Sequence, residues 1–559
     1  MILGIWDGHD AGAAIIEDNK IKIAVNEERL TRKKLDVGFP RESIKCCLNY
    51  LKIKPRDIDL IAASTDDFSK TLTRVFPTLK DRYYVLRRRK KYPKFARWQK
   101  NLKYKLTEIG SSYPTRKISE KILKKSLDKM GFDNYKLKIF DHHMAHAAGA
   151  GFCSDFKKSL VITIDGVGDG ASGSINIFDK GNLERISTIS SKDSLGIFFE
   201  HVTNLLGMRE LEDEGKVMAL SDFAYEIPDK KNPMLEFFEV KNLDINAKYS
   251  STRMWIELRE ILWHTSPEQF AWMAQTTLER NLVNLFSNAI EKTGLKDVAW
   301  CGGVASNIKA NMKIRQLTDI NKWFVFPHMG DGGLALGAAL LLNFEENGIW
   351  NYKFNDAYLG PEYTQGEIED ALKKNKMDYT YEKNIESHIA DLIDEDKIVF
   401  LYQGRMEFGP RALGNRSIIA PSSSLDSKND LNLKIKKRVW YQPFCPTMLG
   451  EDADKIFIDY DYPDHFMTMG FMVRKEYRDE MAAVTNVDGS ARPQMLGDEN
   501  QRYKKILKEI KKKTGFAAVL NTSLNMHGYP IVNTPEEAID LMKKTKSHHM
   551  AIGDFLVEL

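Results

Sequence analysis

Short apolar runs separated by turn residues open the chain and predict three strands. One apolar run ends at Asp7-Gly8, a second covers Ala13–Ile16, and a third, Ile21–Val25, follows the turn Asp18-Asn19-Lys20. Apolar runs of this length, bounded by Gly, Asp and Asn, are typical of strands joined by tight turns. The segment therefore predicts a strand, a glycine-rich turn, a second strand, a turn and a third strand.

The same pattern recurs 158 residues later, where an apolar run ends at Asp165-Gly166 and a turn follows at Asp179-Lys180-Gly181. Internal repetition of this kind indicates a duplicated fold. Two halves that each open with a hairpin carrying Asp-Gly at its tip predict an α/β fold of the actin/hexokinase-like ATPase type. In that fold the two hairpins face each other across a nucleotide cleft. Chance similarity of two strand-turn signals is the alternative interpretation.

The later part of the chain predicts a long helix, a linker and a second α/β domain. Residues 270–294 have helical apolar spacing and end in a glycine, which predicts a helix with a glycine stop. Residues 353–362 form a polar, proline-containing stretch. We therefore expect a first domain at 1–352, a linker at 353–362 and a second domain at 363–559.

Composition places the chain among soluble globular proteins. It has 559 residues, of which 43% are hydrophobic, with 82 Lys and Arg against 78 Asp and Glu. These values exclude a disordered chain, a collagen and a disulfide scaffold. The longest apolar stretch, Leu334–Leu342, has nine residues, whereas a membrane span needs about 20. The first residues lack a basic region, so we expect no signal peptide. Five cysteines without CxxC spacing indicate a reducing compartment. We therefore predict a cytoplasmic protein without a membrane partner.

Positive charge is concentrated between Lys70 and Lys129, which hold 20 Lys and Arg against 4 Asp and Glu. Within Arg87–Lys100, the aromatic residues Tyr92, Phe95 and Trp98 alternate with cations. Cations that meet phosphates and aromatic rings that stack on bases are features of nucleic-acid surfaces. The alternative is a basic, solvated helical face that wraps the domain.

Two histidines and two aspartates are candidate metal ligands. His142 and His146 are four residues apart, so on a helix they share a face and both imidazoles can reach one metal, whereas His143 points elsewhere. Such a pair is more often structural. Asp165 and Asp331, however, lie at an apolar strand end and in a glycine-rich turn, where an unpaired buried carboxylate is costly. Two His and two Asp suit Fe²⁺, Mn²⁺ or Zn²⁺.

His9 and Asp10 lie next to the tip of the first predicted hairpin, and we expect them on the same cleft. Histidine is the usual general base near neutral pH, which makes His9 a candidate base. The alternative role for His9 is that of a turn residue hydrogen-bonded to the backbone.

Basic and hydroxyl residues gather in the second domain. Convergent Arg and Lys side chains with short hydroxyl and amide donors suit phosphate or carboxylate groups, although a single Arg is more often part of a surface ion pair. The candidates are Arg405, Arg411, Arg416, Lys434, Lys436, Lys437, Arg438, Arg492 and the loop Asn521-Thr522-Ser523.

Nine motifs give the chain a resemblance to a known family along nearly its whole length. They are GHDAGAAI (8–15), NEERLTRKK (26–34), HHMAHAA (142–148), ITIDGVGD (162–169), EDEGKVMAL (212–220), CGGVASN (301–307), GDGGLALGAAL (330–340), YLGPEY (358–363) and GRMEFGPRALGNRSI (404–418). The last motif is long and highly specific. The chain resembles the O-carbamoyltransferases that modify antibiotics and nodulation factors.

The resemblance implies an N-terminal domain like the ATPase-fold protein of tRNA threonylcarbamoyl transfer, and a C-terminal YrdC-like domain. It also implies two steps. Carbamoyl phosphate and ATP (bound with Mg²⁺) give carbamoyl adenylate and pyrophosphate in the C-terminal domain. A substrate hydroxyl then takes the carbamoyl group in the N-terminal domain, and AMP leaves. The implied metal is Fe²⁺, with Mn²⁺ or Zn²⁺ as alternatives.

The resemblance also implies roles for individual residues. It makes His142, His146, Asp165 and Asp331 the metal ligands. Catalytic roles fall to His9, Asp10, Arg411 and Lys436. Nucleotide and carbamoyl-phosphate contacts are expected from Gly302, Gly303, Asn307, Gly330, Lys216, Arg405, Arg411, Lys436, Arg438, Arg492, Asn521 and Ser523.

Two departures from the family pattern concern the donor site. Gln442 stands where the family usually has arginine, and Ala420-Pro421-Ser422-Ser423 replaces the usual Ala-Asp-Pro-Arg. We expect a small-molecule hydroxyl acceptor, and the sequence leaves a homodimer open. The alternatives are the same chemistry on a nucleic acid or nucleoside that docks through Lys70–Lys129, and a non-catalytic nucleotide-binding relative. Transfer to a cysteine thiol is disfavoured because the sequence has no CxxC pairs.

Overall fold

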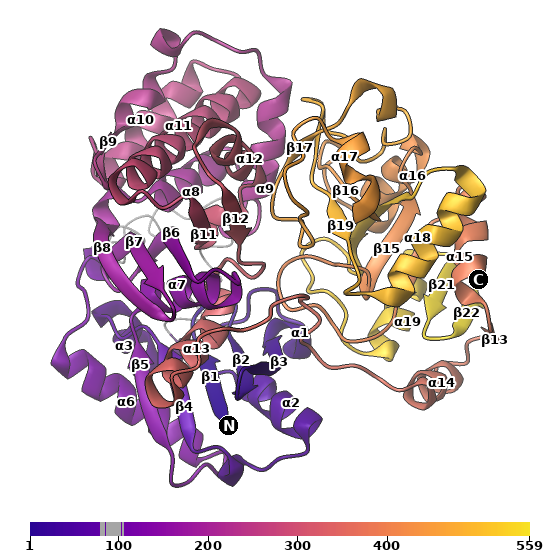
Figure 1. Ribbon diagram of the computed structural model, residues 1–559, viewed down its shortest axis with the longest axis horizontal. Coiled ribbons are helices and arrows are strands. Elements are labelled where there is room, and N and C mark those ends of the chain that lie inside the picture. The colour runs from indigo at the N-terminus through magenta and orange to yellow at the C-terminus, as the bar shows by residue number, and fades with distance from the viewer. Residues whose placement is uncertain (79–83, 85–101, 103–104) are drawn as a thin grey trace. The chain divides into compact units, whose positions relative to one another are not determined.

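Backbone contacts divide the computed structural model, which describes residues 1–78, 84, 102 and 105–559, into two units (Figure 1). Unit 1 holds Met1–Glu27 and Leu35–Phe354, and unit 2 holds Glu28–Lys34 and Asn355–Leu559. The segment Glu28–Lys34 lies inside the expected range 1–352 but packs in unit 2. The aromatic-basic run Arg87–Lys100 lies outside the described residues.

Unit 1 begins with a five-stranded sheet that contains the three strands expected at the start of the chain. Its order is β3-β2-β1-β4-β5, and β1 pairs antiparallel with β2 and parallel with β4. The strands are β1 (Ile2–Trp6), β2 (Gly12–Glu17), β3 (Lys20–Asn26), β4 (Leu60–Ser64) and β5 (Lys136–Phe140).

A second five-stranded sheet repeats this arrangement in the order β12-β11-β6-β7-β8. Its strands are β6 (Lys158–Gly168), β7 (Ala171–Asp179), β8 (Asn182–Ser190), β11 (Asp297–Cys301) and β12 (Lys322–Val325). In each sheet an antiparallel meander of three strands is extended by two parallel strands on the side of its first strand. The duplicated α/β fold of the actin/hexokinase-like type is thereby confirmed.

Two helices exchange places between the halves of unit 1. Helix α7 (His142–Cys153) follows the first sheet but packs on β6 and β11, whereas α13 (Leu334–Asn347) follows the second sheet and packs on β1 and β4. The two helices also pack against each other. A methyl group on Gly337 would lie 1.9 Å from the carbonyl oxygen of Ala145. The Ala- and Gly-rich sequence of α13 thus permits an approach that larger side chains would block.

The other helices of unit 1 lie around these sheets (Figure 1). Four of them, α8 to α11, form an insertion between β8 and β11 together with the hairpin of β9 and β10. The predicted helix at 270–294 is confirmed as α11 (Pro267–Thr293), capped by Ser266 and ended by Gly294 at φ 69°. The remaining elements are α2 (Arg41–Leu51), α3 (Phe68–Val75), α6 (Tyr113–Asp128), α8 (Leu195–Leu205), α9 (Glu214–Leu220), β9 (Phe238–Lys241), β10 (Asp244–Ala247), α10 (Ser251–Trp263) and α12 (Ile308–Leu317).

Unit 2 is built on an eight-stranded mixed sheet in the order β13-β22-β21-β14-β15-β20-β16-β19. Its strands are β13 (Thr380–Tyr381), β14 (Val399–Tyr402), β15 (Arg416–Pro421), β16 (Cys445–Leu449), β19 (Gln494–Leu496), β20 (Ala518–Ser523), β21 (His549–Ile552) and β22 (Phe555–Glu558). A separate pair joins β17 (Phe471–Met472) and β18 (Ser490–Ala491).

Helices of unit 2 bury apolar side chains against this sheet. Helices α15 (Ile385–Asp394) and α18 (Gln501–Thr514) pack together and share an apolar core with β14 and β20. The short α1 (Glu28–Thr31) joins this unit because Arg29 and Arg32 donate hydrogen bonds to the carbonyls of Gly409 and Pro530. The other helices are α14 (Gln365–Lys374), α16 (Leu425–Asp430), α17 (Ala453–Ile456) and α19 (Pro535–Thr545).

Among the described residues, no helix has both the length and the apolar composition that crossing a membrane requires.

Candidate functional site

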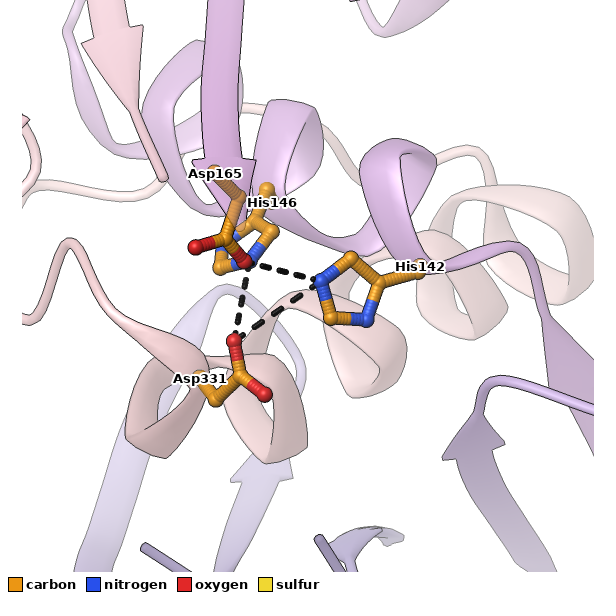
Figure 2. A group of neighbouring side chains, drawn as sticks. All are labelled: His142, His146, Asp165 and Asp331. Carbon is orange, nitrogen blue, oxygen red and sulfur yellow. Dashed lines mark hydrogen bonds and ion pairs between the residues drawn. The ribbon is translucent and has the colours of Figure 1, made fainter. Parts of the chain in front are cut away.

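Four charged or titratable side chains meet inside unit 1, and they are the four predicted metal ligands (Figure 2). His142 and His146 project from α7, Asp165 from β6, and Asp331 from the turn that precedes α13. One ligand atom from each residue lies within 4.8 Å of the others. Asp165 Oδ2 is 3.1 Å from His142 Nε2 and 3.3 Å from His146 Nε2, and Asp331 Oδ1 is 3.7 and 3.6 Å from the same two nitrogens.

Local structure explains how the four side chains converge. Helix α7 begins at His142 because Asp141 accepts a hydrogen bond from the backbone N–H of Met144. One helical turn then places His146 on the same face. Asp165 follows the buried part of β6, and Asp331 follows β12 in the same sheet. The site therefore combines a helix from the first half of unit 1 with one carboxylate from a strand and one from a turn of the second half.

The chemistry of these side chains fits a divalent cation. His146 Nε2 is buried and makes no hydrogen bond of acceptable geometry within the described structure. Burial opposes protonation of both histidines, but nearby carboxylates outweigh it at His142 and raise its pKa. The histidines in turn hold the pKa of Asp165 well below its usual value, against the effect of burial. Two imidazole nitrogens and two carboxylates form a donor set suited to Fe²⁺, Mn²⁺ or Zn²⁺.

Outer contacts fix the orientation of both imidazoles. Thr65 Oγ1 lies 3.0 Å from His142 Nδ1, and Cys301 Sγ lies 3.5 Å from His146 Nδ1. Since the Cys301 thiol donates to the carbonyl of Met329 at 3.3 Å, its sulfur accepts the Nδ1–H of His146. That tautomer leaves a lone pair on Nε2, as metal ligation requires.

Sequence reasoning missed Thr65 and Cys301 as partners of the histidines. Cys301 stands in the CGGVASN motif, whose glycines drew attention instead. Thr65 carries no sequence signal. In the structure it stands out by its contact with His142 and by its backbone, which has φ 69°. A positive φ is unusual for a β-branched residue. The carbonyl of Thr65 accepts a hydrogen bond from Arg74 at 2.7 Å, which helps to hold this conformation.

His143 faces away from the cluster, as the sequence predicted. Its Nδ1 lies 2.9 Å from Thr163 Oγ1 and its Nε2 lies 3.2 Å from the carbonyl of Ala171. Burial, helped by the neighbouring histidines, lowers the pKa of His143 to about 3. The side chain is therefore a neutral, hydrogen-bonded part of the core.

His9 and Asp10 take different positions. His9 Nδ1 lies 3.4 Å from Asp331 Oδ2 and 3.3 Å from Tyr84 Oη. Asp331 thus directs one carboxylate oxygen to the histidine pair and the other to His9. Asp10 Oδ2 instead lies 3.8 Å from His328 Nε2. His9 borders the cavity described next, whereas Asp10 is not among the side chains that line it.

A cavity of about 120 Å³ lies beside the cluster. His142, Asp165 and Asp331 form part of its wall, together with polar and charged side chains from both halves of unit 1. These include His9, Lys70, Asp67, Tyr84 and Glu200. The cavity gives a small, polar ligand access to the predicted metal ligands.

The residues of unit 1 predicted to contact nucleotide fall into two groups. Gly302, at φ 98°, and Gly303 let the backbone pass close to Asp165, and a methyl group on Gly303 would lie 2.7 Å from Asp165 Oδ1. Gly303 N–H donates to that oxygen at 3.2 Å. Gly330 directly precedes Asp331.

Asn307 and Lys216 have their polar groups engaged elsewhere. Asn307 caps α12 through the N–H of Ala310 and exchanges two hydrogen bonds with Gln275. The Lys216 ammonium lies 2.7 Å from Asp213. Neither side chain lines the cavity beside the cluster.

Several cations of unit 2 lie close together. In the part of the chain that the structure describes, none of Arg411, Lys436, Arg438 and Arg492 forms an ion pair with a carboxylate. Lys436 is 3% exposed, and its Nζ lies 2.8 Å from Asn525 Oδ1 and 3.1 Å from Ser523 Oγ. Burial, followed by the charge of Arg438, lowers the pKa of Lys436 well below its usual value.

The arginines of this group repel one another. Burial and the charge of Arg492 lower the pKa of Arg411 to about 9, and burial likewise lowers the pKa of Arg438 to about 9. Arg492 donates to Cys445 Sγ at 2.7 and 3.0 Å. Concentrated positive charge that forms no ion pair with a carboxylate among the described residues favours an anionic ligand.

Other predicted residues of unit 2 have structural contacts. Arg405 donates to the carbonyls of Gly360 and Leu359 at 3.0 and 2.8 Å. Asn521 is buried in the sheet, where its amide donates to Thr447 Oγ1 at 2.8 Å. Gln442 Oε1 is buried and makes no hydrogen bond within the described residues.

Comparison with known proteins adds two family matches and several relatives. The family model described as carbamoyltransferase N-terminus matches residues 1–340, and the one described as carbamoyltransferase C-terminus matches residues 390–559. An uncharacterized protein of Methanocaldococcus jannaschii is 34% identical, covering 100% of this chain and 99% of its own length. Nodulation protein NolNO of Sinorhizobium fredii is 30% identical over 98% of this chain and 79% of its own.

A third relative is the 3'-hydroxymethylcephem-O-carbamoyltransferase of Streptomyces clavuligerus, which is 28% identical over 62% of this chain and 65% of its own. Among solved structures, full-length HypF in a phosphate- and nucleotide-bound form aligns with 63% of this chain and 56% of its own, at 15% identity and a TM-score of 0.38. A ROK hexokinase from Thermus thermophilus aligns with 62% of this chain and 99% of its own, at 13% identity and a TM-score of 0.30.

Proposed function

The chain belongs to the carbamoyltransferase family, and from that premise we propose that it is an ATP-dependent O-carbamoyltransferase with one reaction step in each unit. In unit 2, water cleaves carbamoyl phosphate into carbamate and inorganic phosphate. A carbamate oxygen then bonds to the α-phosphorus of ATP while pyrophosphate leaves. The product is carbamoyl adenylate. In unit 1, a substrate hydroxyl bonds to the carbamoyl carbon and AMP leaves.

The observation that carries the proposal is the buried ammonium of Lys436 in unit 2, with half-buried arginines near it. A buried ammonium without a carboxylate is costly unless an anion binds it. Lys436 meets this condition, Arg411, Arg438 and Arg492 add positive charge, and both donor substrates are phosphates. Ser523 and Asn525 hold the Lys436 ammonium in place.

Unit 1 supplies the groups that the transfer step needs. His142, His146, Asp165 and Asp331 would hold a divalent cation, which supplies positive charge to a bound phosphate. His9 borders the cavity and takes the proton of the attacking hydroxyl. Asp331 Oδ2, 3.4 Å from His9 Nδ1, orients this imidazole and stabilises it once protonated.

The donor step can be tested without knowing the acceptor. Labelled pyrophosphate should exchange into ATP only when carbamoyl phosphate is present, because the adenylate forms reversibly. Lys436→Met should abolish the exchange. Lys434→Met is the matched control, since Lys434 lies in the same segment but is 72% exposed and paired with Asp430. Absence of carbamoyl-phosphate-dependent exchange in the wild type would refute the proposal.

The transfer step requires a second assay. We propose a small-molecule hydroxyl as acceptor, because the cavity beside the cluster is small. Labelled carbamoyl phosphate would be supplied with a panel of aminosugars, nucleosides, polyketides and RNA. His146→Ala should retain the exchange and lose the transfer. Transfer to RNA alone, with salt-sensitive RNA binding, would instead assign the acceptor to nucleic acid and give the segment Lys70–Lys129 a docking role.

A further inference from the structure

The tip of the first hairpin in unit 1 carries more positive charge than its carboxylate requires. Asp7 follows β1 and is buried. Arg74 donates to both of its oxygens, from Nε and Nη2, at 2.9 Å each. The Lys70 ammonium lies 2.7 Å from Asp7 Oδ1 as well. Because Arg74 already binds both oxygens of Asp7, this carboxylate does not require Lys70 for its neutralisation.

Lys70 is buried, yet its ammonium makes no hydrogen bond of acceptable geometry within the described part of the chain. Its side chain is 8% exposed, and Nζ lies 3.9 Å from the centre of the Trp6 ring. Lys70 also lines the cavity beside His142, Asp165 and Asp331. An ammonium has three N–H donors, so Lys70 can keep its ion pair with Asp7 and still donate to a ligand in the cavity.

Two further carboxylates, Asp67 and Glu200, lie on the wall of this cavity. Asp67 accepts the backbone N–H of Lys70 at the start of α3, at 2.7 Å, and that of Asp169 just after β6, at 3.2 Å. Glu200 lines the cavity too, but within the described residues the ion pair of Lys70 is with Asp7. The ammonium of Lys70 therefore faces the same cavity as the predicted metal ligands His142, Asp165 and Asp331.

We infer that Lys70 is a phosphate-binding residue of the transfer site and contacts the phosphate of the nucleotide that leaves. The inference rests on the proposed function, which supplies this nucleotide. When the acceptor oxygen bonds to the carbamoyl carbon, the bond from that carbon to the phosphate oxygen breaks. Its electron pair goes to the phosphate, which gains one negative charge, and the hydroxyl proton goes to His9. An ammonium fixed beside this phosphate stabilises the departing group.

The contact can be measured as binding, without turnover. AMP and adenosine would be titrated calorimetrically, with and without Mn²⁺, into the full chain carrying Lys436→Met and Arg411→Met, which removes two cations of unit 2. Adding Lys70→Met should weaken AMP binding about 10- to 100-fold, the effect of losing a charge-assisted hydrogen bond. Adenosine binding should not change. Lys70→Gln is the second variant if the methionine variant does not fold.

Lys309→Met is the matched control. Lys309 is a buried lysine of unit 1 that forms an ion pair with Asp222 and does not line the cavity, so its loss should leave AMP binding unchanged. Unchanged AMP affinity in the Lys70 variants would overturn the inference. So would equal weakening of AMP and adenosine, or no AMP binding while Lys70 is intact. Pyrophosphate exchange in unit 2 does not involve Lys70, so its absence from the wild type would refute the proposed function separately.

Discussion

Removing His146 should greatly reduce the thermal stabilisation of unit 1 by divalent metal. Its Nε2 lies 3.3 and 3.6 Å from the two carboxylates and makes no hydrogen bond of acceptable geometry in the described structure, so a cation held there loses one of four ligands in His146→Ala. Loss of a residue that only hydrogen-bonds a metal ligand weakens metal binding about 10- to 100-fold. We therefore expect at least a 100-fold weaker affinity when the ligand itself is removed.

The expected stabilisation follows from these affinities. At a free metal concentration of 100 times the wild-type Kd, binding stabilises the wild type by about 2.7 kcal/mol, and a variant with a 100-fold weaker Kd by about 0.4 kcal/mol. Unit 1 contains roughly 350 residues, for which the entropy of unfolding is about 0.7 kcal/mol per kelvin. Metal should thus raise the Tm of unit 1 by about 4 °C in the wild type and by about 0.5 °C in His146→Ala.

Each protein serves as its own reference in this measurement. Calorimetric unfolding with chelator and with Fe²⁺, Mn²⁺ or Zn²⁺ gives the shift for each variant, so effects on folding alone cancel. His143→Ala is the control, because His143 lies on the same helix but hydrogen-bonds Thr163 and Ala171. It should unfold at a lower temperature and keep the full metal shift. An equal shift in His146→Ala and wild type, or no shift in the wild type with any of these metals, would refute the assignment.

Three further predictions test other parts of the structure. Cys301→Ala should weaken metal binding about 10- to 100-fold, measured by calorimetric titration, because His146 loses the acceptor for its Nδ1–H; unchanged affinity would contradict this role. Burial raises the pKa of Glu214 from its ordinary value of 4.5 to about 8, so folding takes up a proton there between these pH values. The contribution of Glu214 to the free energy of unfolding is therefore fully present below about pH 4.5. It is lost as pH rises towards 8, by up to about 1.4 kcal/mol per pH unit. Glu214→Gln should remove this slope in urea unfolding at pH 5, 6.5 and 8, and parallel curves would count against it. Gly337→Ala should destabilise unit 1 by about 3 kcal/mol or more in thermal unfolding, because its methyl group would overlap a carbonyl of α7. Gly215→Ala, which meets open space in α9, should not destabilise it, and equal effects of the two substitutions would refute the packing argument.

Local signals in the sequence predicted the fold of unit 1 well. In the two strand-turn-strand patterns the first apolar run ends at Asp7 and at Asp165. Each pattern opens a sheet, and the two sheets have the same strand order. These features depend on apolar runs and turn residues that lie within about 30 residues of one another. They can therefore be predicted without knowledge of contacts between distant parts of the chain. The pairing of His142 with His146 is local in the same sense, because a helix places residues four apart on one face.

Equivalent aspartates in the two repeats have different charged partners. Asp7 and Asp165 occupy the same place at the hairpin tips, but Asp7 is neutralised by Arg74 and Lys70, whereas Asp165 meets two histidines. Arg74 and Lys70 come from α3, which has no sequence signal linking it to the tip. The difference arises because the flanking helices, not the strands, supply the partners.

Neighbouring residues of one motif also contact different partners in the structure. His9 and Asp10 are adjacent, yet His9 faces Asp331 whereas Asp10 faces His328. Asn307, in a glycine-rich motif, caps a helix and pairs with Gln275. A motif identifies residues that matter together, but the direction of each side chain follows from backbone conformation, such as φ 55° at Asp10.

The sequence by itself determined the duplication, the helix that carries the two histidines and the basic composition of unit 2, because each is encoded in short-range pattern. The tertiary structure decided which charges meet. Asp331 lies beside His142 although 189 positions separate them in the sequence. Lys436 meets the uncharged oxygen atoms of Ser523 and Asn525 because β20 and the loop after it pack against it. Such contacts depend on how sheets and helices pack, and the energy of a buried charge is set by the groups that packing brings within a few ångströms of it.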